Sequence, residues 1–181
     1  MDVIFERLEG NNLPIPTYQT PGSACIDLMA CLTRPMFLCS PSGHKQLFTF
    51  DFKADMFRCI DSSIVSNEES ARVFINAGET VLIPTGFKIS FPSNMVMKIF
   101  IRSSQGLKGL MLANSVGIID SDYRGEIMIA LHNYSGGFTK NIFHGERIAQ
   151  ASFELIERPS IVEGIVDMTE RGAGGFGSTG V

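Results

Sequence analysis

The chain has 181 residues, 44% of them hydrophobic, which is enough for one domain with a substantial core. Its 15 basic and 19 acidic residues give a net charge of −4, so we expect no stable binding to nucleic acid, although a small cationic pocket for a polyphosphate stays open. The N-terminal MDVIFERLEG lacks the basic start of a signal peptide, and no apolar run has the length of a membrane span. We therefore expect a soluble intracellular protein, cytoplasmic or nuclear.

Short apolar stretches with alternating polarity recur between turn signals, which predicts strands. In chain order they are VIFERL, TVLIP, GFKISF, MVMKIFI, GEIMIALHNY, RIAQASFELI and SIVEGIV, at 3–8, 80–84, 86–91, 95–101, 125–134, 147–156 and 160–166. In GFKISF the side chains of Phe87, Ile89 and Phe91 share one face, as they do in a half-buried strand. The pattern predicts an all-β domain, a sandwich or jelly roll, with at most a turn or two of helix after Arg102.

A Phe-rich region at approximately 34–72 stands apart from this pattern. Its segment FTFDF at 48–52 places three rings on one face of a strand. One interpretation is a hairpin that packs on the barrel, and the other is an exposed aromatic face that binds an unknown protein partner.

The segment PGSACIDLMA at 21–30 places Asp27 in the middle of an apolar strand, where a buried carboxylate must be paired, hydrogen-bonded or near a cation. The segment IRSSQGLKG at 101–109 leads from Arg102 into a glycine turn. An arginine with neighbouring serines suits phosphate oxygens, but the same residues also describe a capped turn with a surface arginine.

Two further segments have a structural and a functional interpretation. By spacing alone, GIIDSDYRGE at 117–126 is a tight turn between strands. If another segment supplies the rest of a site, its aspartate can deprotonate a water while its tyrosine supports a sugar. The segment HGERIAQ at 144–150 indicates a turn that leads into a strand.

The chain ends on ERGAGGFGSTGV at 170–181, which fits the letters of a dinucleotide fingerprint. No helix can follow so near the end of the chain, and a P-loop lysine is absent, so both phosphate-loop templates fail. Arg171, Phe176, free N–H groups and two hydroxyls are suited to gripping a phosphate and stacking a base. A mobile tail is the alternative.

Five segments, in this order, resemble the motifs of the homotrimeric dUTP pyrophosphatases (dUTPases) across nearly the whole chain: PGSACIDLMA, IRSSQGLKG, LANSVGIIDSDYRGE, HGERIAQ and RGAGGFGSTG. The resemblance implies a jelly-roll-like β domain at 1–168, with the insertion at approximately 34–72. It also implies a glycine-rich arm at 169–181 that closes over the nucleotide of a neighbouring subunit. The implied reaction is Mg²⁺-dependent hydrolysis of dUTP to dUMP and pyrophosphate, which keeps uracil out of DNA and supplies dUMP, in a homotrimer with shared active sites.

The resemblance also implies a role for individual residues. Asp120 is the general base that activates water for attack on the α-phosphorus, and Asp27 lies near Mg²⁺ through water. The groups that bind uracil and deoxyribose are Asn114, Gly117, Ile118, Tyr123 and Phe176. The groups that bind phosphate are Arg102, Ser103, Ser104, Gln150, Arg171, Gly177, Ser178 and Thr179.

Some departures and alternatives stay open. Ser104-Gln105-Gly106 varies the phosphate turn, so which hydroxyl binds phosphate is undecided. The spacer before the second motif is longer than usual by about forty residues, and the entropic cost of closing a longer loop is small. Such an insertion also leaves a viral origin open. A dCTP deaminase resembles the same fold, but its catalytic glutamate corresponds to Ala130 here, which argues against deamination. A regulator that keeps the fold and binds nucleotide as a switch is the second alternative.

Overall fold

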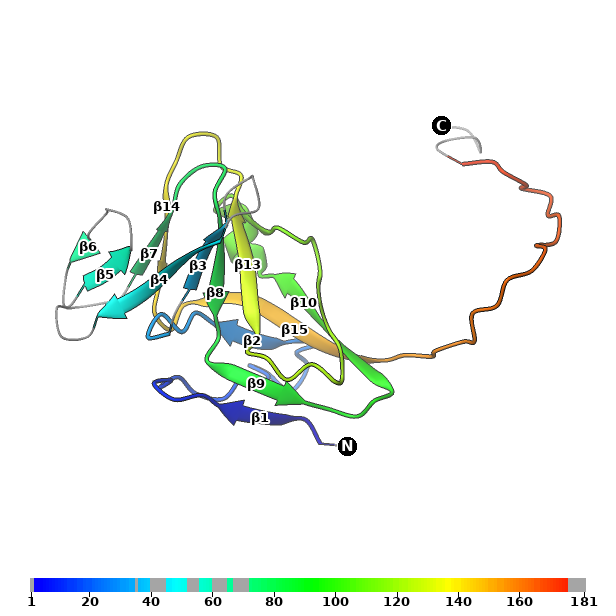
Figure 1. The fold of residues 1–181 in the computed structure, drawn as a ribbon, viewed down its shortest axis with the longest axis horizontal. Coiled ribbons are helices and arrows are strands. Elements are labelled where there is room, and N and C mark those ends of the chain that lie inside the picture. The colour runs from blue at the N-terminus through cyan, green and yellow to red at the C-terminus, as the bar shows by residue number, and fades with distance from the viewer. Residues whose placement is uncertain are drawn as a thin grey trace.

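The structure, a computed structural model, describes residues 2–34, 36–39, 45–51, 56–59, 65–66 and 72–175 (Figure 1). It confirms the all-β prediction, because the described residues contain one short helix, α1 (Ser103–Leu107), and otherwise strands. The first strands are β1 (Ile4–Arg7), β2 (Ile26–Met29), β3 (Met36–Cys39), β4 (Lys45–Asp51), β5 (Met56–Cys59), β6 (Val65–Ser66), β7 (Arg72–Ile75) and β8 (Thr80–Pro84). The others are β9 (Phe87–Ser90), β10 (Met95–Ile101), β11 (Leu110–Leu112), β12 (Gly117–Ile119), β13 (Met128–Asn133), β14 (Lys140–Phe143) and β15 (Arg147–Leu155).

Two large antiparallel sheets form the body. One has four strands in the order β12-β10-β15-β2, and the other has seven in the order β11-β13-β8-β3-β4-β5-β6. Two-stranded pairings, β1 with β9 and β14 with β7, complete the body. Strands that are far apart in sequence are therefore neighbours, and β2 lies beside β15 although more than a hundred residues separate them.

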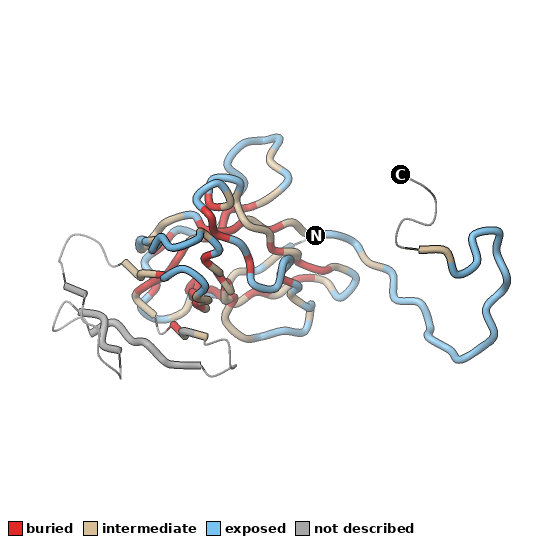
Figure 2. Tube along the Cα trace, turned by 90° about the horizontal axis from the view of Figure 1, so that it is seen from above, coloured by how far each residue is buried: buried red, intermediate tan, exposed pale blue. Residues whose placement is uncertain are grey.

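The core joins alternate side chains of both sheets. Met97 and Ile99 of β10 and Ile129 and Leu131 of β13 belong to one buried cluster. This alternation confirms the inward faces that the sequence pattern predicts, and burial of such apolar surface is the main stabilising contribution to a domain of this size. Figure 2 shows the buried positions concentrated in the body and the exposed ones along the C-terminal segment.

The Phe-rich region at approximately 34–72 extends the seven-stranded sheet. Strand β3 pairs with β8, and β4 and β5 continue the sheet outward in antiparallel order. Strands β4 and β5 pair as an antiparallel hairpin, which is the structural part of the first interpretation. Of the predicted aromatic segment, Phe52 lies outside the described residues.

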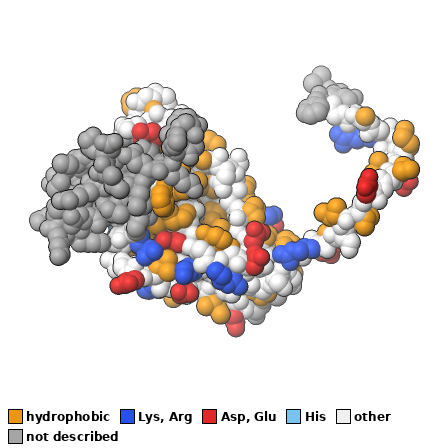
Figure 3. All heavy atoms as spheres, viewed as in Figure 1, with side chains coloured by type: hydrophobic (Ala, Val, Ile, Leu, Met, Phe, Trp, Pro, Cys, Tyr) orange, Lys and Arg blue, Asp and Glu red, His pale blue; other side chains and the backbone are white. Residues whose placement is uncertain are grey.

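The predicted strand at 160–166 is wrong. The last strand ends at Leu155, and residues 156–169 run away from the body without regular structure (Figure 1). Five apolar side chains of this segment are at least 82% exposed: Ile161, Val162, Ile165, Val166 and Met168. Figure 3 shows hydrophobic side chains spread along the extended C-terminal segment. A strand needs a hydrogen-bonded neighbour, and none of the described strands pairs with this segment.

Candidate active site

The carboxylate of Asp27 is held between two guanidinium groups. Asp27 lies on β2 and is only 7% exposed. Its Oδ1 lies 2.9 Å from Nε of Arg102, and its Oδ2 lies 3.1 Å from Nη1 of Arg147. The requirement that a buried carboxylate be paired is thus met twice.

Arg102 precedes the five-residue helix α1 and stands at the end of β10. Its carbonyl accepts hydrogen bonds of 3.0 Å from the N–H groups of Gln105 and Gly106, which fix the turn. Ser103 and Ser104 are exposed in the first positions of the helix. The predicted turn after Arg102 is confirmed, and it presents two hydroxyls beside a guanidinium.

Gln150 completes this first group. In the four-stranded sheet it lies opposite Asp27 of β2 on one side and Phe100 of β10 on the other. Its Nε2 donates to the carbonyl of Ile101 at 3.3 Å. The predicted phosphate-binding residues of the body, listed here together with Asp27, therefore gather at one end of the sheet: Asp27, Arg102, Ser103, Ser104 and Gln150.

The second group lies on the turn that connects β11 of the seven-stranded sheet to β12 of the four-stranded sheet, and on the loop after β12. Asn114 is exposed in the turn, where Ser115 has a left-handed φ of 62°. Gly117 is buried against β10, and a Cβ on it would lie 3.0 Å from Cβ of Ile99. Ile118 follows with its side chain 54% exposed. The turn and the start of β12 thus present backbone groups and one apolar side chain to the outside.

Asp120 and Tyr123 share the turn that follows β12. The N–H of Tyr123 donates to the carbonyl of Asp120 at 3.1 Å, and both side chains are exposed. The Tyr123 hydroxyl donates to the carbonyl of Glu126 at 2.9 Å. A Cβ on Gly125 would lie 2.3 Å from that hydroxyl, so only glycine leaves room for the ring.

Glu126 anchors this loop to the body. Its Oε1 accepts hydrogen bonds from the N–H of Gly86 at 2.8 Å and from Nε of Arg34 at 2.9 Å. This anchor was not predicted from the sequence. Only Glu126 itself, directly after the tyrosine loop, could have indicated it, because Arg34 and Gly86 are remote in sequence.

Within one chain the two groups are far apart. Asp120 follows Ile119, which pairs with Met97 near the start of β10. Arg102 follows Ile101 at the other end of the same strand. Asp120 and Arg102 each lie one residue beyond the span from Met97 to Ile101, so six residues of strand separate their levels, which at about 3.3 Å per residue is about 20 Å. Within one chain, Arg102 and Asp120 therefore lie at opposite ends of β10.

Of the predicted residues of the arm, the structure describes Arg171. Arg171 is exposed, and its Nε donates to the carbonyl of Gly174 at 2.9 Å. Figure 1 shows this part of the chain far from both groups of the body. Phe176, Gly177, Ser178 and Thr179 lie outside the described residues.

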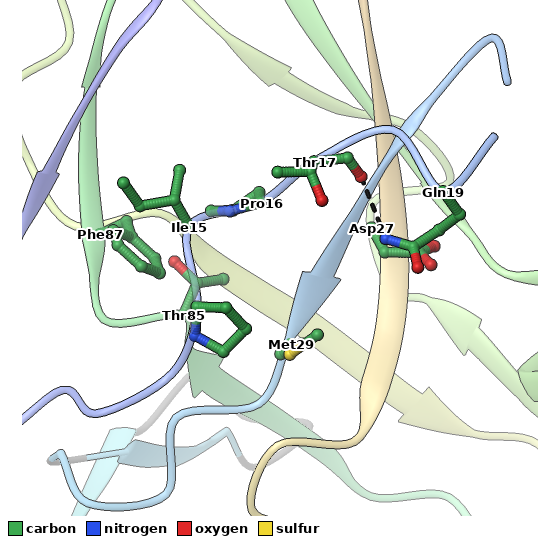
Figure 4. Close-up of a pocket in the computed structure, with 9 residues that line it drawn as sticks. Ile15, Pro16, Thr17, Gln19, Asp27, Met29, Thr85 and Phe87 are labelled. Carbon is green, nitrogen blue, oxygen red and sulfur yellow. Dashed lines mark hydrogen bonds between the residues drawn. The ribbon is translucent and has the colours of Figure 1, made fainter. Parts of the chain in front are cut away.

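A small cavity of 190 Å³ lies beside Asp27 (Figure 4). Ile15, Met29 and Phe87 contribute apolar walls, and the segment with Thr17 and Gln19 contributes polar ones. Gln19 donates from Nε2 to the carbonyl of Thr17 at 3.2 Å and accepts from Arg147 at 3.1 Å. The N-terminal segment therefore supports the ion pairs of Asp27 from outside the sheet.

Glu146 forms a polar cluster behind the phosphate turn. Its Oε1 accepts from Nε2 of Gln105 at 2.8 Å and from Nζ of Lys108 at 3.0 Å, and its Oε2 accepts from the N–H of Phe143 at 3.0 Å. Burial opposes ionisation, but the donors outweigh it and the pKa of the Glu146 carboxyl is lowered. This cluster around Glu146 was not predicted from the sequence.

The residues present fit Mg²⁺ bound mainly by substrate. Among the described residues no three His, Cys, Asp or Glu side chains are grouped so that they could hold a metal ion. Mg²⁺ retains waters and takes phosphate oxygens as ligands, so no protein cage is required. Each Asp27 oxygen has a lone pair beyond the one that accepts an arginine, which leaves room for a metal-bound water. Separately, the described part of the chain has no helix that is both long and apolar enough to span a bilayer.

Comparison with known proteins gives relatives along almost the whole chain. The deoxyuridine 5'-triphosphate nucleotidohydrolase of Tolumonas auensis is 38% identical over 181 residues, which cover 98% of this chain and 94% of that protein. The protein of the same name from Serratia proteamaculans is 37% identical and covers 98% of this chain and 93% of its own length.

Solved dUTPases have the same fold. The dUTPase of Streptococcus mutans superposes with a TM-score of 0.57 at 26% identity, covering 88% of this chain and 98% of that one. A mutant dUTPase of Staphylococcus bacteriophage 80alpha with dUpNHpp has a TM-score of 0.68 at 20% identity, with 99% of both chains covered. A mutant dUTPase of phage phi11 of S. aureus, described with a structural Mg(II) ion, has a TM-score of 0.62 at 17% identity, with 90% and 96% covered.

Residues 67–180 match the profile of the dUTPase family. This match spans the second to fifth motifs, and the relatives extend the similarity through the first. The chain belongs to the dUTPase family.

Proposed function

We propose that this chain hydrolyses dUTP to dUMP and pyrophosphate as a homotrimer whose active sites combine residues of neighbouring subunits. Its relatives are named for hydrolysis of this nucleotide. The observation that carries the shared-site proposal is the separation of Arg102 and Asp120 by the length of β10. A second chain has to supply one of the two.

The first group binds the phosphates. Asp27 accepts from Nε of Arg102, which fixes the guanidinium plane while other N–H groups of Arg102 remain for the substrate. Two arginines around one carboxylate leave this corner with a net positive charge. Ser103, Ser104 and Gln150 add hydrogen bonds. Such fixed donors neutralise a triphosphate and stabilise the charge that develops during attack on phosphorus.

Asp120 acts as the general base. Its exposed carboxylate takes the proton of a water that attacks the α-phosphorus, and the pyrophosphate leaves from the opposite side. The turn that joins Asp120 to Tyr123 sets the position of the carboxylate. Holding the water in line removes much of the entropic cost of a bimolecular step.

The turn between β11 and β12 recognises the nucleoside. Asn114 and the backbone through Gly117 and Ile118 read the edge of uracil, and the wrong hydrogen-bonding pattern of cytosine leaves polar groups unpaired. The tight turn leaves no room for the methyl group of thymine. Tyr123, fixed by its hydrogen bond to Glu126, supports the deoxyribose and leaves no space for a 2′-hydroxyl.

The arm closes the site of a neighbouring subunit. Arg171 binds the γ-phosphate, Gly177, Ser178 and Thr179 support it, and Phe176 stacks on uracil. Closure expels water and strengthens each electrostatic contact inside. Asp27 would hold Mg²⁺ indirectly, and the ion, when bound with the substrate phosphates, would supply further charge neutralisation.

Pyrophosphate release from dUTP in the presence of Mg²⁺ tests the proposed function. We expect rapid release from dUTP and little from dCTP or dTTP under the same conditions. Binding of dUTP without release would contradict hydrolysis and favour a nucleotide-binding regulator. Release of ammonia from dCTP would favour a deaminase.

A further inference from the structure

A β-bulge in β15 determines where the Arg147 side chain lies. Gln150 pairs with Asp27 and Ala149 with Leu28, but the next residue of β2 pairs with Arg147, so β15 contains one extra residue. Ile148 and Ala149 are consecutive and both fully buried. A bulge shifts the alternation of side chains by one position, and bulges are frequent beside active sites. Arg147 therefore emerges on the face of the sheet that carries Asp27.

Arg147 contacts the phosphate-binding group through both its side chain and its backbone. Nη1 donates to Oδ2 of Asp27 and to Oε1 of Gln19, at 3.1 Å each. Its carbonyl accepts from Nη1 of Arg102 at 3.3 Å and from Nε2 of Gln105 at 3.2 Å. Arg102 thus contacts Arg147 directly, through the Arg147 carbonyl, and indirectly, through the Asp27 carboxylate that both guanidinium groups share.

We propose that Arg147 is a positioning residue for Arg102, acting through Asp27, and this inference rests on the proposed binding of dUTP. A carboxylate favours two parallel hydrogen bonds from a single guanidinium. With Oδ2 occupied by Arg147, Asp27 engages only Nε of Arg102. Nη1 of Arg102 also donates to the Arg147 carbonyl, and the N–H groups of Arg102 that remain then face the phosphates. Without Arg147, Asp27 is free to take a second N–H of Arg102, which turns the guanidinium toward the protein.

The proposal predicts a coupled effect of Arg147 and Asp27 on nucleotide binding. R147Q should weaken dUpNHpp binding, measured by calorimetry with Mg²⁺, by about tenfold, because one charge-assisted contact is redirected. In a D27N background the carboxylate that mediates the effect is gone. There the same substitution should change the affinity by less than about twofold, since residues that act through one group are not additive.

Kinetics and a conservative variant separate positioning from loss of fold. We expect the KM for dUTP to rise more than kcat falls in R147Q, because Arg102 contacts the phosphates before and during the reaction. R147K should recover part of the loss, since its ammonium reaches Asp27 without the planar fork. As a matched control, R72Q changes an arginine on β7 whose guanidinium lies 5.0 Å from the centre of the Phe74 ring, and it should bind dUpNHpp like the wild type.

Other results would overturn either the positioning role of Arg147 or the proposed hydrolysis of dUTP. Wild-type affinity in R147Q would overturn the positioning role, and equal losses in the wild-type and D27N backgrounds would overturn action through Asp27. If R147Q does not fold, R147K and D27N/R147K are compared by the same criterion. A wild-type protein that neither binds dUpNHpp nor hydrolyses dUTP would overturn the proposed function, and this inference with it.

Discussion

The hydroxyl of Tyr123 lies 2.3 Å from the point at which Gly125 would carry a Cβ. This close approach lets the ring fold back over its own turn and donate to the carbonyl of Glu126 at 2.9 Å. The position of the tyrosine thus depends on a missing side chain two residues later. Because Gly125 has no left-handed φ, an added methyl group would disturb the ring and not the backbone.

We therefore predict that G125A displaces Tyr123 and lowers kcat/KM for dUTP by about 10- to 100-fold, the usual cost of a misplaced substrate contact. Selectivity for dUTP over UTP should fall as well. The matched control is G136A, because a Cβ at Gly136 meets no atom within 4 Å. Equal kcat/KM values for G125A and the wild type would show that Tyr123 does not need this conformation.

The exposed turn after β12 offers a direct test of the general base. D120N should lower kcat by about 10²- to 10⁴-fold, the usual contribution of a general base, while leaving dUpNHpp affinity nearly unchanged. Asp122 is an exposed carboxylate of the same turn, so D122N controls for the loss of charge. Near-normal turnover in D120N would refute the assignment.

For the arm, we predict a loss of activity without a loss of fold. F176A, or truncation after Glu170, should lower kcat/KM by about 10²-fold, because the closed site loses its stacking ring and its exclusion of water. The control F138A removes another ring, on Phe138, which is 71% exposed on the body. Unchanged kcat/KM in the truncated protein would exclude a role for the arm.

His144 makes the stability of the body dependent on pH. Its Nδ1 accepts from the N–H of Leu32 at 3.1 Å, so the ring is neutral and its Nε2, 2.8 Å from Oδ1 of Asn12, donates. Burial lowers the pKa of His144 below its ordinary value of 6.5. The unfolded chain therefore binds a proton first as the pH falls, and the free energy of unfolding decreases below about pH 6.5 until the folded pKa is passed.

Thermal unfolding between about pH 8 and pH 5 measures this effect. The variant H144N provides the comparison, since an asparagine oxygen can accept the Leu32 N–H and does not titrate. We expect the unfolding midpoint of the wild type to fall more steeply than that of H144N in this range. Parallel curves would contradict the inference that the neutral ring is required.

The sequence pattern predicted β1, β8, β9, β10, β13, β15 and the turn after Arg102, because alternation and turn residues are local signals, but it did not predict β7 or β14. The strand predicted at 160–166 failed for a physical reason, since apolar alternation does not provide a neighbouring strand. The need of Asp27 for a partner was predictable, but its second partner was not, because a bulge of one residue decides which face Arg147 takes. The same holds for Glu126, whose donors are distant in sequence.

The central claim is that Arg102 and Asp120 of different subunits act on one nucleotide, because one chain holds them about 20 Å apart. The most direct measurement mixes inactive R102Q and D120N subunits after verified exchange. Random trimers in equal proportion should pair an intact Arg102 with an intact Asp120 in ½ × ½ of the sites, so about a quarter of the wild-type activity should return. Activity that stays at the level of the separate variants would contradict the shared site.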